Sequence, residues 1–152
     1  MKMIPYMLRE HTESDRNFIL NSFLQSFREH SNHSYIPKSI YYKNQAEIIE
    51  FLLSTANCLV VCFPEAPEEI MGYIIYEQVV GNLVVHFAYI KTTYRTHHIM
   101  NEIIDSIIPS STSNIIATHI PYYFRYLKEK SKYSMVYDPY YITNKRLLHN
   151  RT

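Results

Sequence analysis

Apolar residues recur at every third or fourth position in two early stretches of the chain, which is the spacing of amphipathic helices. The first stretch predicts a helix over residues 15–28, preceded by a short strand over residues 4–8. The second predicts a helix whose N-terminus Asn44 can cap. The apolar residues that carry the two stripes are Ile19, Phe23, Phe27, Ile48, Ile49, Leu52 and Leu53.

The middle of the chain has a different pattern, in which β-branched and apolar residues form continuous runs. Such runs are typical of strands, and strands are predicted over residues 57–63, 70–80 and 83–91. The last two are separated by Gly81-Asn82. A Gly-Asn pair between two apolar runs predicts a hairpin.

Helical spacing returns over residues 96–108. The remaining pattern predicts a strand over 114–119, a helix over 122–132 and a last strand over 135–142. The order of elements is therefore β-α-α-β-β-β-α-β-α-β, with no repeat or linker. Residues 1–152 are long enough to bury a sizeable core and are predicted to form a single domain.

Glycine is scarce, and this excludes two kinds of nucleotide-binding protein. The chain has two glycines, whereas average usage near 7% would give about ten in a chain of this length. A dinucleotide-binding fingerprint or a P-loop needs two or three glycines within one short loop. Neither motif can be built here.

Charge and tyrosine content keep a binding role open. The net charge is +1, but residues 121–152 carry seven basic and two acidic residues. This segment is either a face that binds an acidic partner or a solvated basic helix. The 15 tyrosines form either a face for protein or nucleic acid or a tyrosine-rich core.

Cysteine and histidine give no sign of a disulfide or a metal site. Cys58 and Cys62 lie in one predicted strand, too far apart for a disulfide, and are expected to be buried thiols. His97 and His98 diverge by about 100° on a forming helix, so no metal is expected. No apolar run approaches the roughly 20 residues of a membrane span, so no membrane contact is expected.

The order of elements resembles the GNAT N-acetyltransferase superfamily over nearly the whole chain. Residues 70–74 (IMGYI) resemble the family's third strand, residues 89–95 (YIKTTYR) the end of its fourth strand, and residues 127–133 (LKEKSKY) a segment near its C-terminus. Residues 15–23 (DRNFILNSF) and 85–91 (VHFAYIK) resemble GNAT-like proteins of tailed bacteriophages. The resemblance implies an α/β fold with a central, mostly antiparallel sheet of six or seven strands and helices on both faces.

The resemblance also implies acetyl-CoA as the cofactor, held at the end of the fourth strand and by the loop after it. Backbone groups of the strand end would bind the pantetheine, and the loop would wrap the pyrophosphate at a helix N-terminus. The family loop has small residues at two positions that His98 and Met100 occupy here, which predicts a degenerate cofactor loop. The residues expected to contact the cofactor are Tyr89, Ile90, Lys91, Arg95, Thr96, His97, His98, Ile99 and Met100.

The groups that would move protons are less defined. Many relatives use a tyrosine to protonate the departing thiolate, but alignment of the C-terminal segment places Lys128 at that position. Tyr126 is nearby and is the candidate acid. His86, on the predicted fourth strand, is the candidate base because its ordinary pKa suits the task; a structural hydrogen bond is the alternative for it.

Two functions follow from these observations. In the first, the protein is a phage-encoded GNAT fold with a weakened cofactor loop, and it acts through contacts with a host or virion protein. In the second, it is an acetyl-CoA-dependent N-acetyltransferase that modifies a lysine or an amino-terminal amine, for instance on a host protein. Nucleic acid is a further candidate partner. The expected location is the host cytoplasm, or the virion for a structural role, and the oligomeric state is left open.

Overall fold

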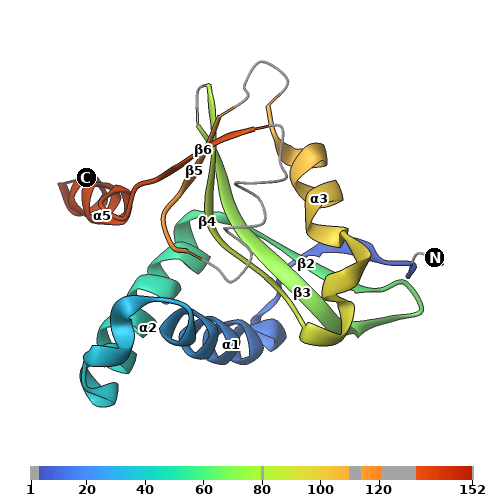
Figure 1. Ribbon diagram of the computed structural model, residues 1–152, viewed down its shortest axis with the longest axis horizontal. Coiled ribbons are helices and arrows are strands. Elements are labelled where there is room, and N and C mark those ends of the chain that lie inside the picture. The colour runs from blue at the N-terminus through green and yellow to red at the C-terminus, as the bar shows by residue number, and fades with distance from the viewer. Residues whose placement is uncertain (1–3, 80, 110–113, 121–132, 152) are drawn as a thin grey trace.

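The computed structural model describes residues 4–79, 81–109, 114–120 and 133–151 (Figure 1). Three short 3-10 helices, Glu13–Asp15, Asn32–Tyr35 and Thr92–His97, lie between the main elements. The helices are α1 (Arg16–Glu29), α2 (Lys38–Thr55), α3 (Ile99–Ile107) and α5 (Tyr141–Arg151). The strands are β1 (Met7–Glu10), β2 (Asn57–Phe63), β3 (Ala66–Val79), β4 (Asn82–Ile90), β5 (Asn114–Ala117) and β6 (Ser134–Tyr137).

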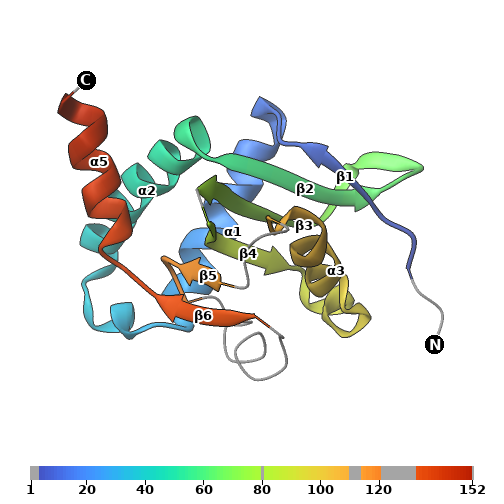
Figure 2. The same ribbon diagram turned by 90° about the horizontal axis from the view of Figure 1, so that it is seen from above.

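The strands of the described residues form one sheet, in the order in which they occur along the chain. Strands β1 to β4 pair antiparallel, whereas β5 runs parallel to β4 and β6 runs parallel to β5. Helices α1 and α2 lie on one face of this sheet and α3 lies on the other (Figures 1 and 2). The predicted α/β fold, with a mostly antiparallel sheet of six or seven strands and helices on both faces, is confirmed, and the described residues form six strands.

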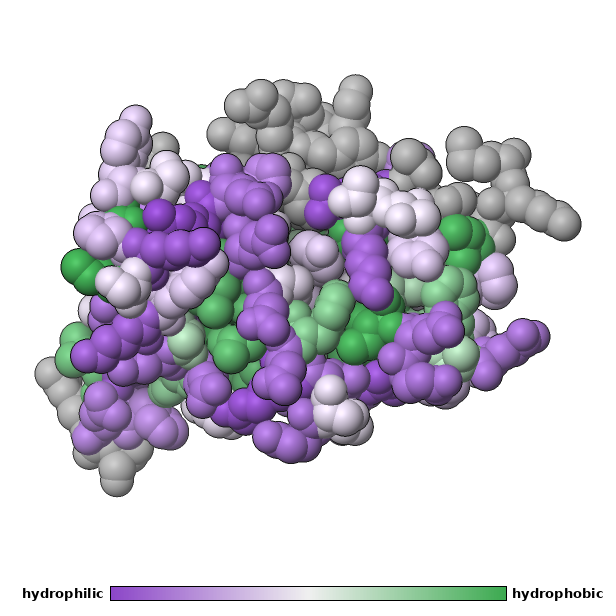
Figure 3. All heavy atoms as spheres, turned by 90° about the horizontal axis from the view of Figure 1, so that it is seen from below, coloured by the Kyte–Doolittle hydropathy of each residue, from purple (hydrophilic) through white to green (hydrophobic). Residues whose placement is uncertain are grey.

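Each face of the sheet has its own core, because successive side chains of a strand point to opposite faces. On β4, Phe87 packs with α1 and α2, and the next residue, Ala88, packs with α3. The face of the molecule on the side of α1 and α2 is mainly hydrophilic, with smaller apolar areas (Figure 3). The amphipathic stripes of the sequence therefore face inward. Both cysteines are buried free thiols, as predicted.

Several predicted boundaries are wrong. Helix α2 begins at Lys38, six residues before Asn44, because the preceding Pro37 starts it; the Asn44 side chain donates to the carbonyl of Ile40 within the helix. Strand β1 covers residues 7–10 rather than 4–8, since those residues are the ones that reach β2.

The C-terminal strand is shorter than predicted. It ends at Tyr137, where the Asp138 carboxylate accepts the backbone N–H of Tyr140 in a turn that leads into α5. Ile142, predicted in the strand, is instead buried in the core from α5. The predicted hairpin at Gly81 is present, and this glycine has a positive φ of 78°. The predicted helix over residues 122–132 lies outside the described residues.

Helix α5 packs beside α2 at one end of the molecule (Figures 1 and 2). The rings of Phe51 on α2 and His149 on α5 have their centroids 5.4 Å apart. None of the helices in the described ranges is long and apolar enough to span a bilayer.

Candidate functional site

Strand β4 has one edge that is paired only in part. It pairs with β3 as far as Ile90, but it pairs with β5 only over Leu83–Val85. Among the described residues, the last backbone-to-backbone hydrogen bond on this edge runs from the Thr118 N–H to the Val85 carbonyl and is 3.1 Å long. Beyond it, no described strand pairs with this edge, so β4 and β5 diverge. We call residues 86–90 on this side the open edge.

The peptide groups that face the open edge follow from the register with β3. The Lys91 N–H donates to the Met71 carbonyl at 2.8 Å, away from the open edge. Because peptide groups of an antiparallel strand alternate in direction, those of Ala88 and Ile90 point toward the open edge. The Ile90 carbonyl there accepts the Nε of Arg95 at 2.8 Å.

Gly72 allows β3 to stay paired with β4 up to Ile90. It lies opposite Ile90, and a Cβ at this position would collide with the carbonyl oxygen of Tyr89. The close approach of the two backbones therefore requires glycine. One of the two glycines of the chain thus supports the end of β4.

The loop after β4 leads directly into the N-terminus of α3. His98 is the residue before α3 and has φ 54° and ψ 24°, in the left-handed region. It is the only non-glycine residue with positive φ among those the structure describes. Glycine most readily adopts this conformation, so His98 has a backbone conformation that is usually found at glycine. The side chain of His98 is exposed.

The next two predicted cofactor residues point into the protein. Ile99 and Met100 are each 2% exposed and belong to the core between α3 and the sheet. Met100 therefore packs beneath α3 and not on the solvent side of the loop. The backbones of Thr96 and His97 lie in the 3-10 helix, whereas their side chains are outside what the structure describes. The degenerate character of the loop stays a prediction.

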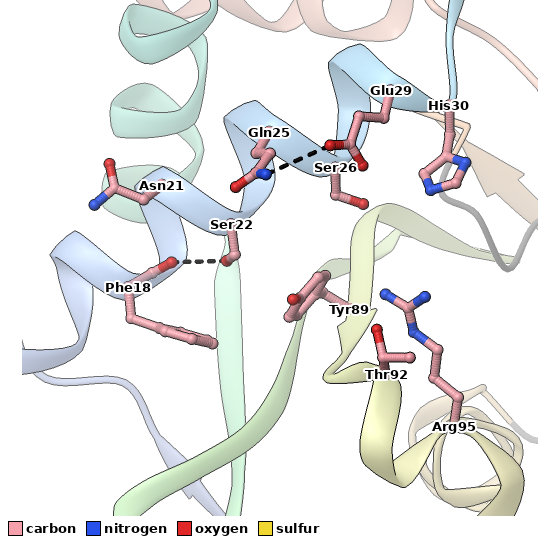
Figure 4. Close-up of a pocket in the computed structure, with 10 residues that line it drawn as sticks. All are labelled: Phe18, Asn21, Ser22, Gln25, Ser26, Glu29, His30, Tyr89, Thr92 and Arg95. Atoms are coloured by element: carbon pink, nitrogen blue, oxygen red, sulfur yellow. Dashed lines mark hydrogen bonds between the residues drawn. The ribbon is translucent and has the colours of Figure 1, made fainter.

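A pocket of about 450 Å³ lies between α1 and the C-terminal end of β4 (Figure 4). We call it the α1–β4 pocket. Most of its lining is polar, and most of the polar groups come from one side of α1. The lining residues are Phe18, Asn21, Ser22, Gln25, Ser26, Glu29, His30, Tyr89, Thr92 and Arg95.

Two aromatic rings and a guanidinium form the lower wall of the α1–β4 pocket. The rings of Phe18 and Tyr89 meet edge to face with centroids 6.2 Å apart. The guanidinium carbon of Arg95 lies 5.7 Å from the centre of the Tyr89 ring. Since the Nε of Arg95 also bonds the carbonyl of Ile90, the pocket and the open edge share this residue and adjoin each other.

The α1 side of the pocket contains one unsatisfied group. The Ser22 hydroxyl donates to the Phe18 carbonyl at 2.7 Å, and the Gln25 amide donates to the Glu29 carboxylate at 3.4 Å. The Ser26 hydroxyl is buried and has no hydrogen-bond partner among the described residues. A buried unpaired hydroxyl costs about 1–3 kcal/mol, so a ligand that bonded it would recover that cost.

None of the α1 residues of this pocket was predicted as functional. Their signal in the sequence is a polar stripe at helical spacing, beside the apolar stripe that predicted the helix. Only the position of β4 shows that part of this polar stripe, at Ser22 and Ser26, is covered by the sheet.

His86, the predicted base, lies in the core at a distance along β4 from the pocket and is not among its lining residues. Its Nδ1 is 3.0 Å from the Thr118 hydroxyl and its Nε2 is 2.6 Å from the Glu77 carboxylate. Burial lowers the pKa of His86, which favours the neutral ring, against the opposing effect of Glu77. These contacts are the structural hydrogen bonds that the alternative prediction for His86 expected. The role of His86 as a base stays a prediction.

The contacts of His86 belong to a longer buried chain of polar side chains. Lys145 lies 2.8 Å from the second carboxylate oxygen of Glu77. At the other end, the Thr118 hydroxyl is 3.1 Å from Nδ1 of His119, whose Nε2 is 2.9 Å from the Gln45 amide. Burial lowers the pKa of His119 to about 3. When the imidazoles of His86 and His119 are both neutral, each hydrogen bond in this series of buried side chains has one donor and one acceptor.

Burial also opposes ionisation of Glu77, but the hydrogen bonds from His86 and Lys145 outweigh it and lower the pKa of this carboxyl. Tyr126, the predicted acid, lies outside the described residues. Within the described ranges, no three histidine, cysteine or acidic side chains converge on a point where they could hold a metal ion.

Comparison with known proteins identifies the fold. No model of a protein family matches the sequence, and no curated protein matches it. A candidate acetyl transferase from Pyrococcus furiosus has a similar structure, with a TM-score of 0.53 and 13% identity over 93% of this chain and 91% of that one. A candidate acetyltransferase from Clostridium difficile 630 gives a TM-score of 0.50 and 14% identity over 88% of this chain and 78% of that one. At these identities the likeness shows the fold, which is that of the GNAT acetyltransferases.

Proposed function

We propose that the protein is an N-acetyltransferase that uses acetyl-CoA. The observation that carries the proposal is the placement of the open edge of β4 immediately before the N-terminus of α3. The open edge can bind an extended ligand through its backbone peptide groups. The N-terminus of α3 can bind an anion through its backbone N–H groups and the positive end of the helix dipole. The GNAT fold of the chain supports the same reading.

The residues present fit such a cofactor. The left-handed backbone at His98 gives the loop the shape that a glycine would give it, and the burial of Met100 removes its side chain from the solvent side of the loop. Peptide groups over residues 88–91 would hold the pantetheine, and those over residues 96–100 the pyrophosphate. Acetyl-CoA supplies an acetyl group activated as a thioester.

The remaining tasks fall to the side chains of the chain. The α1–β4 pocket, which adjoins the open edge, is proposed to bind and orient the acceptor amine. Tyr126 is proposed to donate a proton to the leaving thiolate. His86 is proposed to act as the base: burial favours its neutral ring, and the contacts with Glu77 and Thr118 fix the orientation of that ring.

Isothermal titration calorimetry with acetyl-CoA and CoA tests the proposal. We expect both to bind, and His98→Asp to weaken both at least tenfold, because aspartate tolerates positive φ but adds a negative charge at the phosphate site. Asn144→Asp adds the same charge on the exposed face of α5 and serves as the control. A saturating ligand at 100 times its Kd also stabilises the fold by about 2.7 kcal/mol, which thermal unfolding measures independently. No binding at millimolar acetyl-CoA would end the proposal.

A second candidate function rests on the exposed apolar side chains of β6, of α5 and of the turn between them. Val136 is 54% exposed, Tyr140 73% and Leu148 64%, although apolar residues of this size are mostly buried. In this candidate the protein is phage-encoded and acts by contact with a host or virion protein, in the host cytoplasm or in the particle. Failure to bind acetyl-CoA, together with capture of a host or virion protein that Leu148→Glu abolishes, would favour it over the enzyme.

A further inference from the structure

The charges of the α1–β4 pocket indicate the class of acceptor. We infer that this pocket binds a small amine that also carries a carboxylate, of the free amino acid class. The inference rests on the proposed function, because it names the acceptor of the same site. It differs from the expectation of a lysine or an amino terminus on a protein.

One side of the pocket is negative. Glu29 is the last residue of α1, and the C-terminal end of a helix carries a partial negative charge of its own. Among the described residues, no cation forms an ion pair with Glu29. The neighbouring Arg28 is directed elsewhere: its guanidinium donates to the carbonyls of His33 and Ser34. An ammonium group is therefore attracted to this side.

The opposite side is positive. Arg95 is held by the bond from its Nε to the Ile90 carbonyl and by its position against the Tyr89 ring. Figure 4 shows the guanidinium end of Arg95 directed toward the space beneath α1. A guanidinium presents a planar pair of donors that matches a carboxylate. The pocket thus places a cation and an anion on facing sides.

The space between them suits a small polar molecule. Ser26 is 7% exposed, and its hydroxyl lacks a partner among the described residues. Figure 4 shows this hydroxyl on the side of α1 that faces Arg95. Phe18 and Tyr89 supply apolar walls, and a volume of about 450 Å³ is within the range of small-molecule sites.

A lysine side chain of a protein matches this pocket less well. It would bring an ammonium group to Glu29 but no carboxylate to Arg95. A free amino acid would bring a group of opposite charge to each of them. Because the peptide group of Ile90 faces the open edge and the side chain of Tyr89 lines the pocket, the pocket adjoins the proposed cofactor site.

Binding of matched probes to the protein without cofactor tests the inference. We propose calorimetry with three zwitterions of increasing length, β-alanine, γ-aminobutyrate and ε-aminocaproate, and with the amines that lack their carboxylate. At least one zwitterion is expected to bind tenfold or more tighter than its matched amine. Arg95→Gln is expected to abolish that difference, and Glu29→Gln to weaken zwitterion and amine alike. The charge-matched controls Lys43→Gln and Glu47→Gln, on the exposed side of α2, are expected to leave both unchanged.

Ser26→Ala separates a ligand contact from a structural role. Removal of an unpaired buried hydroxyl is expected to raise the melting temperature while it weakens the zwitterion severalfold. If both the melting temperature and the affinity for the zwitterion fall, the Ser26 hydroxyl has a structural role and the proposed contact with the ligand is contradicted. The inference is overturned if no zwitterion binds better than its matched amine, or if a lysine-containing peptide with blocked ends binds as tightly as the best zwitterion.

The two proposals fail separately. If acetyl-CoA binds but the zwitterions show no advantage over the amines, the acetyltransferase stands and the amino acid class falls. If the zwitterions bind as expected but acetyl-CoA does not, the pocket stands and the proposed function falls.

Discussion

We expect mild acid to destabilise this protein through His119, because burial favours the neutral form of its imidazole. Its pKa is about 3 in the folded protein, against 6.5 as the ordinary value. A group with a lowered folded-state pKa contributes its full stability above the unfolded-state pKa, and that stability is lost as the pH falls toward the folded-state value. For His119 the loss therefore begins near pH 6.5 and continues toward pH 3.

The size of the effect follows from proton linkage. When the pH falls from about 7.5 to about 4.5, His119 takes up a proton in the unfolded chain but stays neutral in the folded protein. This difference lowers the free energy of unfolding by about 2.7 kcal/mol. The loss over this interval depends mainly on the pKa of the unfolded chain, because the folded-state value lies well below it. It is a large part of the roughly 5–15 kcal/mol that stabilises a typical domain.

Urea unfolding of the wild type and of His119→Gln at the two pH values measures the effect. The glutamine can keep a contact with Gln45 but cannot titrate. Other groups contribute to the pH dependence of both proteins, His86 in the same direction since its pKa is also lowered by burial. The difference between the two proteins is therefore the quantity to compare, and we expect the wild type to lose about 2.7 kcal/mol more.

Parallel pH dependence of the two proteins would refute the reasoning. A second measurement does not require a folded variant. In the wild type, the NMR signals of the His119 ring are expected to stay those of a neutral imidazole at about pH 4.5, well below its ordinary pKa. A protonated ring in the folded protein at that pH would equally contradict the prediction.

Three further substitutions test other parts of the structure. Asp15→Asn removes the charge that pairs with Arg9 and one of the two oxygens that accept from it, at 2.7 and 2.9 Å, and is expected to cost about 3 kcal/mol in urea unfolding at neutral pH; a cost below about 1 kcal/mol would show that the pair contributes little to stability. Gly72→Ala places a Cβ against the Tyr89 carbonyl and is expected to cost about 1–3 kcal/mol in thermal unfolding, whereas unchanged stability would mean that β3 and β4 separate freely there. His98→Gly is expected to leave stability within about 1 kcal/mol, because glycine adopts positive φ at no steric cost, while His98→Val lowers Tm; equal Tm values for the two variants would contradict the left-handed assignment.

Much of the fold was predictable because it depends on local pattern. The apolar stripe of Ile19, Phe23 and Phe27 is enough to define α1 and its buried face, since a helix repeats every 3.6 residues. Gly81 marks the hairpin because its turn needs a positive φ. The predicted cofactor segment, residues 89–100, runs without interruption from the end of β4 into α3, so its position was also predictable.

The candidate site was predictable only where it is local. Residue type predicts a degenerate cofactor loop from His98 and Met100, and this stays a prediction. The sequence did not indicate that His98 adopts the left-handed backbone or that Met100 packs beneath α3. Side-chain direction in a loop depends on the core beside it, which local sequence does not specify.

The sequence by itself determined most of the helices and strands, because propensity and periodicity act over a few residues, but it did not indicate α5, whose first residues were predicted to be strand. Tertiary structure alone decided where the polar side of α1 points and which distant residues meet. His86 and Thr118 are 32 residues apart, and Gln45 and His119 are 74 apart. Such pairs form only when strands and helices stack, because hydrogen bonds and buried charges depend on distance in space and not on separation along the chain.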